Sequence, residues 1–189
     1  MWASAMQAIT ANFDLQAALA PQTGVCNVGI VQVDATPAIL SAVARAANQA
    51  GCNARTVELT GFAEAFEAGL AIINVETSQA FGHLVASGKL GADLDARLRA
   101  AAKTTSAQRD AAESVRRQFT AAVDHALESV DVLILPTLPA LPITLAEARS
   151  GTSVIGMSSL IRPFNLSGHP ALSLPLPVDG SPLKAGLQI

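Results

Sequence analysis

The sequence predicts an α/β fold, and three observations support this prediction. Residues 28–59 show a strand pattern, a helix pattern and a second strand pattern in succession, which is the order of a βαβ unit with parallel strands. Residues 130–135, Val-Asp-Val-Leu-Ile-Leu, form a nearly continuous aliphatic run, typical of a central strand covered on both faces. Two more strand patterns follow at 171–176 and 185–189. The 189 residues suffice for one domain with a sizeable core.

The βαβ unit begins with the β-rich run at 28–33. Thr36 and Pro37 then supply an N-cap residue and a proline at the first helical position, and Gly51 stands where a left-handed C-cap is expected. Between them, apolar residues recur at helical spacing on one face. The strand pattern at 53–59 completes the unit.

Two long helices are predicted in the middle of the chain. In the first, which ends before Gly88, we expect an apolar stripe to be buried, formed by Phe62, Phe66, Leu70, Ile73, Ala80, Phe81 and Leu84. A short leucine-bearing segment follows at 90–98. In the second helix, Ser106 is the predicted N-cap, apolar residues from Val115 to Val130 form one face, and the charged residues form a solvated face.

The last part of the chain reads as strands joined by proline-containing turns. Residues 136–139, Pro-Thr-Leu-Pro, stop the aliphatic strand, and the turn-rich segment 177–182 joins the two final strands. Residues 1–24 are alanine-rich and fit only a helical or loop lead-in, so the main unit is predicted to cover residues 25–189.

The composition predicts apolar surface that must be buried by something beyond the chain's own polar residues. Half of the residues are apolar, only 14% are charged and the mean hydropathy is +0.39, whereas about a quarter of residues are charged in an average soluble domain. Every apolar run stops short of the ~18 residues that a membrane-spanning helix needs, so the cover is expected to be a partner or a further part of the fold. With no basic residue before Arg45 to form a secretory leader, we expect a cytoplasmic protein.

Several other classes of function lack the residues that they need. A net charge of −3, with basic residues that form no stripe, gives no basis for nucleic-acid binding. Cys26 and Cys52 are interpreted as reduced thiols, because two cysteines do not make a disulfide framework. We find neither a metal-ligand cluster nor a glycine-rich phosphate loop, and we expect no metal or cofactor.

Ser167 and His169 are the serine and histidine that a hydrolase would need. The chain has no G-x-S-x-G turn, however, and residues so close in sequence are expected not to aim their side chains into one hydrogen bond. We therefore interpret Gly-His-Pro at 168–170 as a turn that leads into a strand. His83 and His125 lie on predicted helices and are interpreted as satisfied or solvent-facing side chains.

Three linked segments resemble the C-terminal half of the amidase-signature family. They are Asp-Val-Leu-Ile-Leu-Pro-Thr at 131–137, Asn-Leu-Ser-Gly-His-Pro-Ala-Leu-Ser-Leu-Pro at 165–175 and Gly-Leu-Gln at 186–188. In that family an aspartate precedes an aliphatic strand closed by Pro-Thr, an N-[LI]-[TS]-G-x-P-A strand follows, and a turn leads into G-L-Q. The resemblance covers residues 25–189.

This resemblance implies an α/β/α fold with a mixed sheet covered by helices on both faces. It also implies hydrolysis of a carboxamide by a Ser, cis-Ser, Lys triad, whose serines and lysine belong to the family's N-terminal half. Neither the Gly/Ser-rich loop of that half nor a lysine at the family's strand-end position is present here, since the chain has only Lys89, Lys103 and Lys184. We therefore assign no catalytic residue.

The resemblance further implies that the segment between the Pro-Thr strand end and the N-L-S-G motif helps to wall the acyl pocket. The candidate substrate-binding residues are Thr137, Ile155, Met157, Ser158 and Arg162. Arg162 is of particular interest, because a guanidinium can hold a carboxylate or a polar amide by paired hydrogen bonds.

Three functional hypotheses follow. In the first, the chain is a truncated amidase or an amidase fragment without the catalytic half, and it is inactive alone. In the second, it is a non-catalytic subunit that docks onto a separate N-terminal amidase half or another protein, or self-associates, through an exposed sheet edge. In the third, it is a self-sufficient α/β binding domain.

Overall fold

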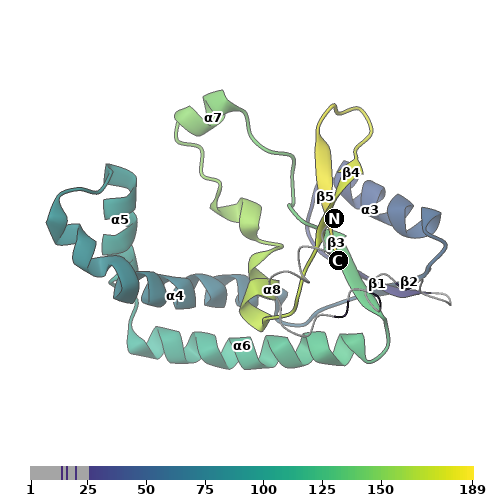
Figure 1. The fold of residues 1–189 in the computed structure, drawn as a ribbon, viewed down its shortest axis with the longest axis horizontal. Helices are drawn as coiled ribbons and strands as arrows, with labels where there is room; N and C mark the ends of the chain where they lie inside the picture. The colour runs from purple at the N-terminus through teal and green to yellow at the C-terminus, as the bar shows by residue number, and fades with distance from the viewer. Residues whose placement is uncertain (1–13, 15, 17–19, 21–25) are drawn as a thin grey trace.

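The computed structural model describes residues 14, 16, 20 and 26–189. The lead-in predicted for residues 1–24 therefore lies outside the described residues, apart from those three positions. The remainder is an α/β structure, in which one sheet runs between helices of the two faces (Figure 1).

The sheet has five strands in the order β2-β1-β3-β5-β4. Their bounds are Asn27–Val31 for β1, Asn53–Val57 for β2, Val132–Pro136 for β3, Ser173–Pro177 for β4 and Lys184–Gln188 for β5. β1 pairs in parallel with β2 and with β3, whereas β5 pairs antiparallel with β3 and with β4. The prediction of a mixed sheet with the aliphatic strand at its centre is confirmed.

The βαβ unit is confirmed, with α3 at Pro37–Gln49 as its crossover helix. Thr36 is the N-cap residue by position, but its side chain makes no capping hydrogen bond. Gly51 adopts a φ of 66°, the left-handed conformation expected just after the helix. The two strands are shorter than predicted, because the pairing of β1 with β2 ends at Val31 and Val57.

The buried stripe predicted for the first long helix is confirmed only in part, since Phe62, Phe66, Leu70 and Leu84 are partly buried and the other three residues are exposed. α4 covers Phe62–Phe81, and its buried residues are Ala65, Ala68, Gly69 and Ile72. Ile73 and Phe81 remain 52% and 53% exposed. Small side chains are buried instead because α6 and α8 both pack on this helix and approach its backbone closely. The helical run then continues as the 3₁₀ helix η1, Gly82–Ser87, and ends at Gly88 as predicted.

The second long helix begins one residue earlier than predicted. α6 covers Ser106–Leu127 and is capped by Thr105, not by Ser106. The Thr105 hydroxyl accepts a hydrogen bond from the Gln108 backbone N–H, and the Gln108 side chain accepts one from the Thr105 N–H, forming a reciprocal capping box. The shorter helix α5, Ala92–Ala101, precedes it.

The N-L-S-G motif belongs to a helix and not to a strand. Three short helices follow β3, namely α7 at Leu145–Arg149, η2 at Ile155–Ser158 and α8 at Arg162–Ser167. Asn165 to Ser167 form the last turn of α8, and Gly168, with a φ of 81°, ends it. β4 therefore begins at Ser173, two residues later than predicted.

Two apolar cores flank the sheet, because alternate residues of each strand point to opposite faces. On one face Leu133 and Leu135 of β3 pack with residues of α4, α6 and α8. On the other face Ile134 packs with Val43 and Ala47 of α3. Phe62, Phe119 and Phe164 fix α4, α6 and α8 to one another through edge-to-face ring contacts at centroid distances of 5.8, 6.0 and 6.1 Å.

Candidate functional site

A cavity of about 400 Å³ lies where α4, α6 and α8 meet. One wall is made by four residues of α4 that recur at helical spacing, Gly69, Ile72, Ile73 and Glu76, and α6 contributes Arg116 to the lining. The opposite wall is made by residues that flank or belong to α8, namely Ser158, Ile161, Arg162, Asn165 and Leu166. The cavity has the size of a small-molecule site.

The cavity brings together two of the residues singled out in the sequence, Ser158 and Arg162. Arg162 is the first residue of α8, and buried Pro163 and Phe164 next to it fix that helix on the core. Its Nη2 donates a hydrogen bond to the Ser158 hydroxyl at 2.9 Å. The guanidinium carbon lies 4.3 Å from the centroid of the Phe66 ring, within cation–π distance.

Arg162 carries a charge that the described residues do not neutralise by an ion pair. Its Nη1 atom is buried and has no hydrogen-bond partner among the described residues. Burial lowers the pKa of the Arg162 guanidinium, and the charge of Glu67 acts in the opposite direction. A buried donor without a partner is rare in folded proteins and indicates either strain or a place where a ligand binds.

The other three predicted site residues lie elsewhere. Thr137 follows β3, and its hydroxyl lies 2.6 Å from the Ser173 hydroxyl of β4. Ile155 and Met157 belong to η2; Ile155 is exposed and Met157 is partly exposed. Sequence reasoning missed Gly69 and Glu76, although their spacing on a helix was the signal that could have placed them on one wall.

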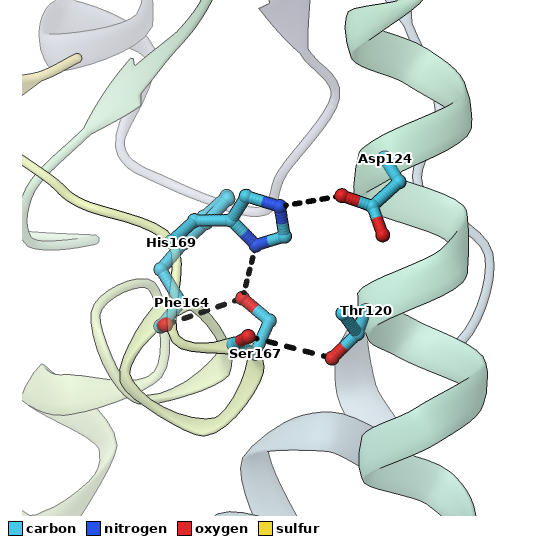
Figure 2. A network of polar contacts seen from close by, with 5 residues as sticks. All are labelled: Thr120, Asp124, Phe164, Ser167 and His169. Atoms are coloured by element: carbon cyan, nitrogen blue, oxygen red, sulfur yellow. Dashed lines mark hydrogen bonds and ion pairs between the residues drawn. The ribbon is translucent and has the colours of Figure 1, made fainter.

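Figure 2 shows a second polar cluster, which joins the end of α8 to α6. The Ser167 hydroxyl lies 2.9 Å from Nδ1 of His169, and Nε2 of His169 lies 3.1 Å from a carboxylate oxygen of Asp124. Thr120 donates to the Ser167 carbonyl oxygen at 3.4 Å. The expectation that Ser167 and His169 could not share a hydrogen bond is wrong, because the left-handed turn at Gly168 brings the two side chains face to face.

The hydrogen bonds of this cluster favour a structural role over a nucleophilic one. The Ser167 hydroxyl has two neighbours, the Phe164 carbonyl oxygen at 3.2 Å, to which it can donate its one hydrogen, and His169 Nδ1 at 2.9 Å, whose role as donor or acceptor is set by the tautomer of the ring. When the hydroxyl donates to Phe164, Nδ1 is left to donate. A general base must instead accept the proton of the nucleophile. The His169 side chain is only 18% exposed, while the Asp124 side chain is 66% exposed. The cluster therefore clamps the N-L-S-G-H-P segment onto α6.

The lysines and the other two histidines lie on the surface of the described part of the chain. Lys89, Lys103 and Lys184 are all exposed. His125 contacts Glu128 at 3.0 Å on the surface, and His83 is exposed. Among the described residues, no three His, Cys, Asp or Glu side chains are arranged to hold a metal ion. No described helix combines the length and the apolar character required to cross a bilayer.

Comparison with known proteins gives one family. The family model named Amidase matches residues 2–189. Over 79 residues the chain is 39% identical to a glutamyl-tRNA(Gln) amidotransferase subunit of Microcystis aeruginosa and 42% identical to the corresponding protein of Nocardia farcinica. These matches cover 41% and 40% of this chain and 16% of each relative.

Solved structures show the same fold at low sequence identity. A bacterial aryl acylamidase of the amidase-signature family superimposes with a TM-score of 0.70 at 19% identity, over 92% of this chain and 41% of the other. Allophanate hydrolase of Kluyveromyces lactis gives 0.74 at 19% identity, over 86% and 29%. The chain thus spans well under half the length of these relatives.

Proposed function

The chain belongs to the amidase family, and we propose that it forms the pocket-lining part of an amidase and has no turnover of its own. Carboxamide hydrolysis would then require a second polypeptide segment that carries the serine nucleophile and the lysine base. In this arrangement the protein supplies sheet scaffold, pocket wall and substrate contacts. Its two cysteines, neither of which forms a disulfide, are compatible with work in the reducing cytoplasm.

The observation that carries this proposal is the exposure of all three lysines of the sequence. A lysine can act as a general base near neutral pH only when burial or a neighbouring cation lowers its pKa. Lys89, Lys103 and Lys184 make no side-chain hydrogen bond or ion pair within the described residues, so none is held against a serine.

The proposed pocket wall is centred on Ser158 and Arg162, which the structure brings together at one cavity. Thr137, Ile155 and Met157 stay candidates for a wider pocket that a neighbouring segment would complete. We assign none of these five residues a role in bond breaking.

A second candidate function is that of a subunit that docks onto a separate amidase N-terminal segment. β4 is an edge strand of the described sheet, and Leu172, Leu174 and Leu183 at this edge are exposed. An open edge with exposed leucines can pair with a further strand. Curated relatives are themselves named as subunits, which agrees with this possibility.

Ammonia release from simple aliphatic and aromatic amides tests the first proposal. We expect the purified chain to give no rate above buffer. Turnover that persists in Ser167→Ala would contradict the proposal by showing another nucleophile within the chain. Turnover that disappears in Ser167→Ala would also contradict it and would assign catalysis to the cluster in Figure 2.

Co-expression tests the docking function. We expect the chain to co-purify with an amidase N-terminal segment that carries the Gly/Ser-rich loop and the lysine, and the complex to hydrolyse amides. Leu174→Lys at the β4 edge should abolish co-purification, whereas Leu145→Lys on the exposed surface of α7 should not. Equal effects of both substitutions would refute docking at this edge.

A further inference from the structure

The charged lining of the cavity between α4, α6 and α8 is unbalanced. Two guanidinium groups, Arg116 and Arg162, and one carboxylate, Glu76, line it. Arg116 already has an acidic neighbour outside the lining, because its Nη1 lies 3.7 Å from Glu113. Arg162 has no ion-pair partner within 4 Å among the described residues, and Glu67, whose charge acts on it from farther away, is not part of the lining. Within the lining, the excess positive charge is therefore at the α8 wall.

An uncompensated guanidinium in a partly buried position destabilises a fold, since its desolvation is repaid only by hydrogen bonds and opposite charge. The Arg162 guanidinium has five N–H donors. Its Nη2 donates to the Ser158 hydroxyl, whereas its buried Nη1 has no partner among the described residues. The Phe66 ring stabilises the cation but supplies no hydrogen-bond acceptor. A carboxylate is the group whose geometry matches a guanidinium with unused donors.

The position of Arg162 is set by the backbone of α4. A Cβ atom at Gly69 would lie 2.7 Å from Cγ and 3.0 Å from Cδ of Arg162, so the arginine stem occupies the space that any larger residue would fill. Neutral polar groups stand beside the charge, since the Asn165 and Ser158 side chains belong to the same wall. These groups suit a carboxamide or hydroxyl on the same small ligand.

We propose that this cavity binds the carboxylate of a small acidic amide and that Arg162 is the residue that selects it. The inference rests on the proposed function and deepens it, because it gives the substrate class as amides that also carry a carboxylate. Arg162 acts here as a binding residue, with Gly69 and Ser158 positioning its side chain.

Succinamate and succinamide are suitable probes, since they share a carboxamide and differ by one carboxylate. We expect isothermal titration of the purified chain to give at least tenfold tighter binding of succinamate. Arg162→Met should remove that preference, and Arg149→Met, which deletes an exposed arginine of α7, should leave it unchanged. Circular dichroism should show both variants folded, because Arg162→Met removes a charge that the fold does not neutralise.

Equal binding of the two probes by the parent chain would overturn the inference without any variant. So would an unchanged preference in folded Arg162→Met. The measurement uses neither turnover nor a second polypeptide, so it is separate from the tests of the proposed function. If the chain prefers succinamate but shows no activity together with an N-terminal segment, the binding site is supported and the proposed function is contradicted. If the complex is active but the chain shows no preference for succinamate, the proposed function is supported and the binding site is contradicted.

Discussion

Replacing Gly186 by alanine should destabilise the sheet where the Gly-Leu-Gln motif of β5 lies between β3 and β4. A Cβ atom at this position would lie 2.5 Å from Thr137 Oγ1, 2.7 Å from Thr137 Cβ and 2.8 Å from Ser173 Oγ. All three separations are shorter than the 3.0 Å that real Cβ contacts respect. The nearest obstacles include a β-carbon, so Thr137 or its strand must move, and the Thr137–Ser173 hydrogen bond of 2.6 Å is lost.

The expected cost follows from these two effects. Overpacking costs about 1–3 kcal/mol, and the lost hydrogen bond adds about 0.5–1.5 kcal/mol. We therefore expect the free energy of unfolding to fall by roughly 2–4 kcal/mol, out of a typical total of about 5–15 kcal/mol. If the free energy of unfolding falls by about 2 kcal/mol per molar urea, the unfolding midpoint should fall by about 1–2 M.

Urea unfolding followed by far-ultraviolet circular dichroism measures this change. Gly156→Ala is the matched control, because no atom lies within 4 Å of a Cβ at Gly156, and its effect should stay within about 0.5 kcal/mol. A midpoint of Gly186→Ala equal to that of the parent and of Gly156→Ala would refute the steric argument.

Three further changes have defined outcomes. Phe119→Ala removes one ring of the aromatic trio, a side chain that is 1% exposed, and should lower the free energy of unfolding in urea by about 3–5 kcal/mol. Phe81→Ala, at an exposed ring, should lower it by under ~0.5 kcal/mol. Similar losses in both variants would contradict the assigned core. Thr105→Ala should lower the unfolding free energy by about 1 kcal/mol by removing the α6 cap, and Thr105→Ser should restore it; no difference between the two variants would argue against the capping box. Cys26 and Cys52 directly precede the paired residues of β1 and β2, and diamide, which takes up two hydrogen atoms, should join their sulfurs within one molecule. Mass spectrometry should show the loss of two hydrogens in the monomer, and exclusive formation of cross-linked dimers would show that the sulfurs do not meet.

Local sequence signals were sufficient for most elements of the fold. Pro37 and Gly51 mark the bounds of α3 because their preferred backbone angles match a helix start and a left-handed end. The aliphatic run before Pro136 was correctly predicted to be the central strand, since a strand covered on both faces buries such a run. The family resemblance carried by three short motifs was confirmed by the family match.

The lining of the candidate cavity could be predicted only in part from the sequence. Two of the five residues predicted to bind substrate, Arg162 and Ser158, line it, and their role in binding stays a prediction. Gly69 and Glu76 were not, because a helix pattern shows which residues share a face but not which neighbour that face contacts. The same limit explains the partly misplaced stripe of α4, where Ile73 is exposed and Gly69 is buried.

What the sequence by itself determined is therefore local: helix and strand periods, the residues that begin and end elements, and the absence of a lysine in a catalytic motif. Tertiary structure alone decided the strand order, the meeting of α4 with α8 and the contact between His169 and Asp124. Those features join residues far apart in the chain. Propensity and periodicity act over a few residues, whereas packing selects among faces that the sequence pattern leaves equivalent.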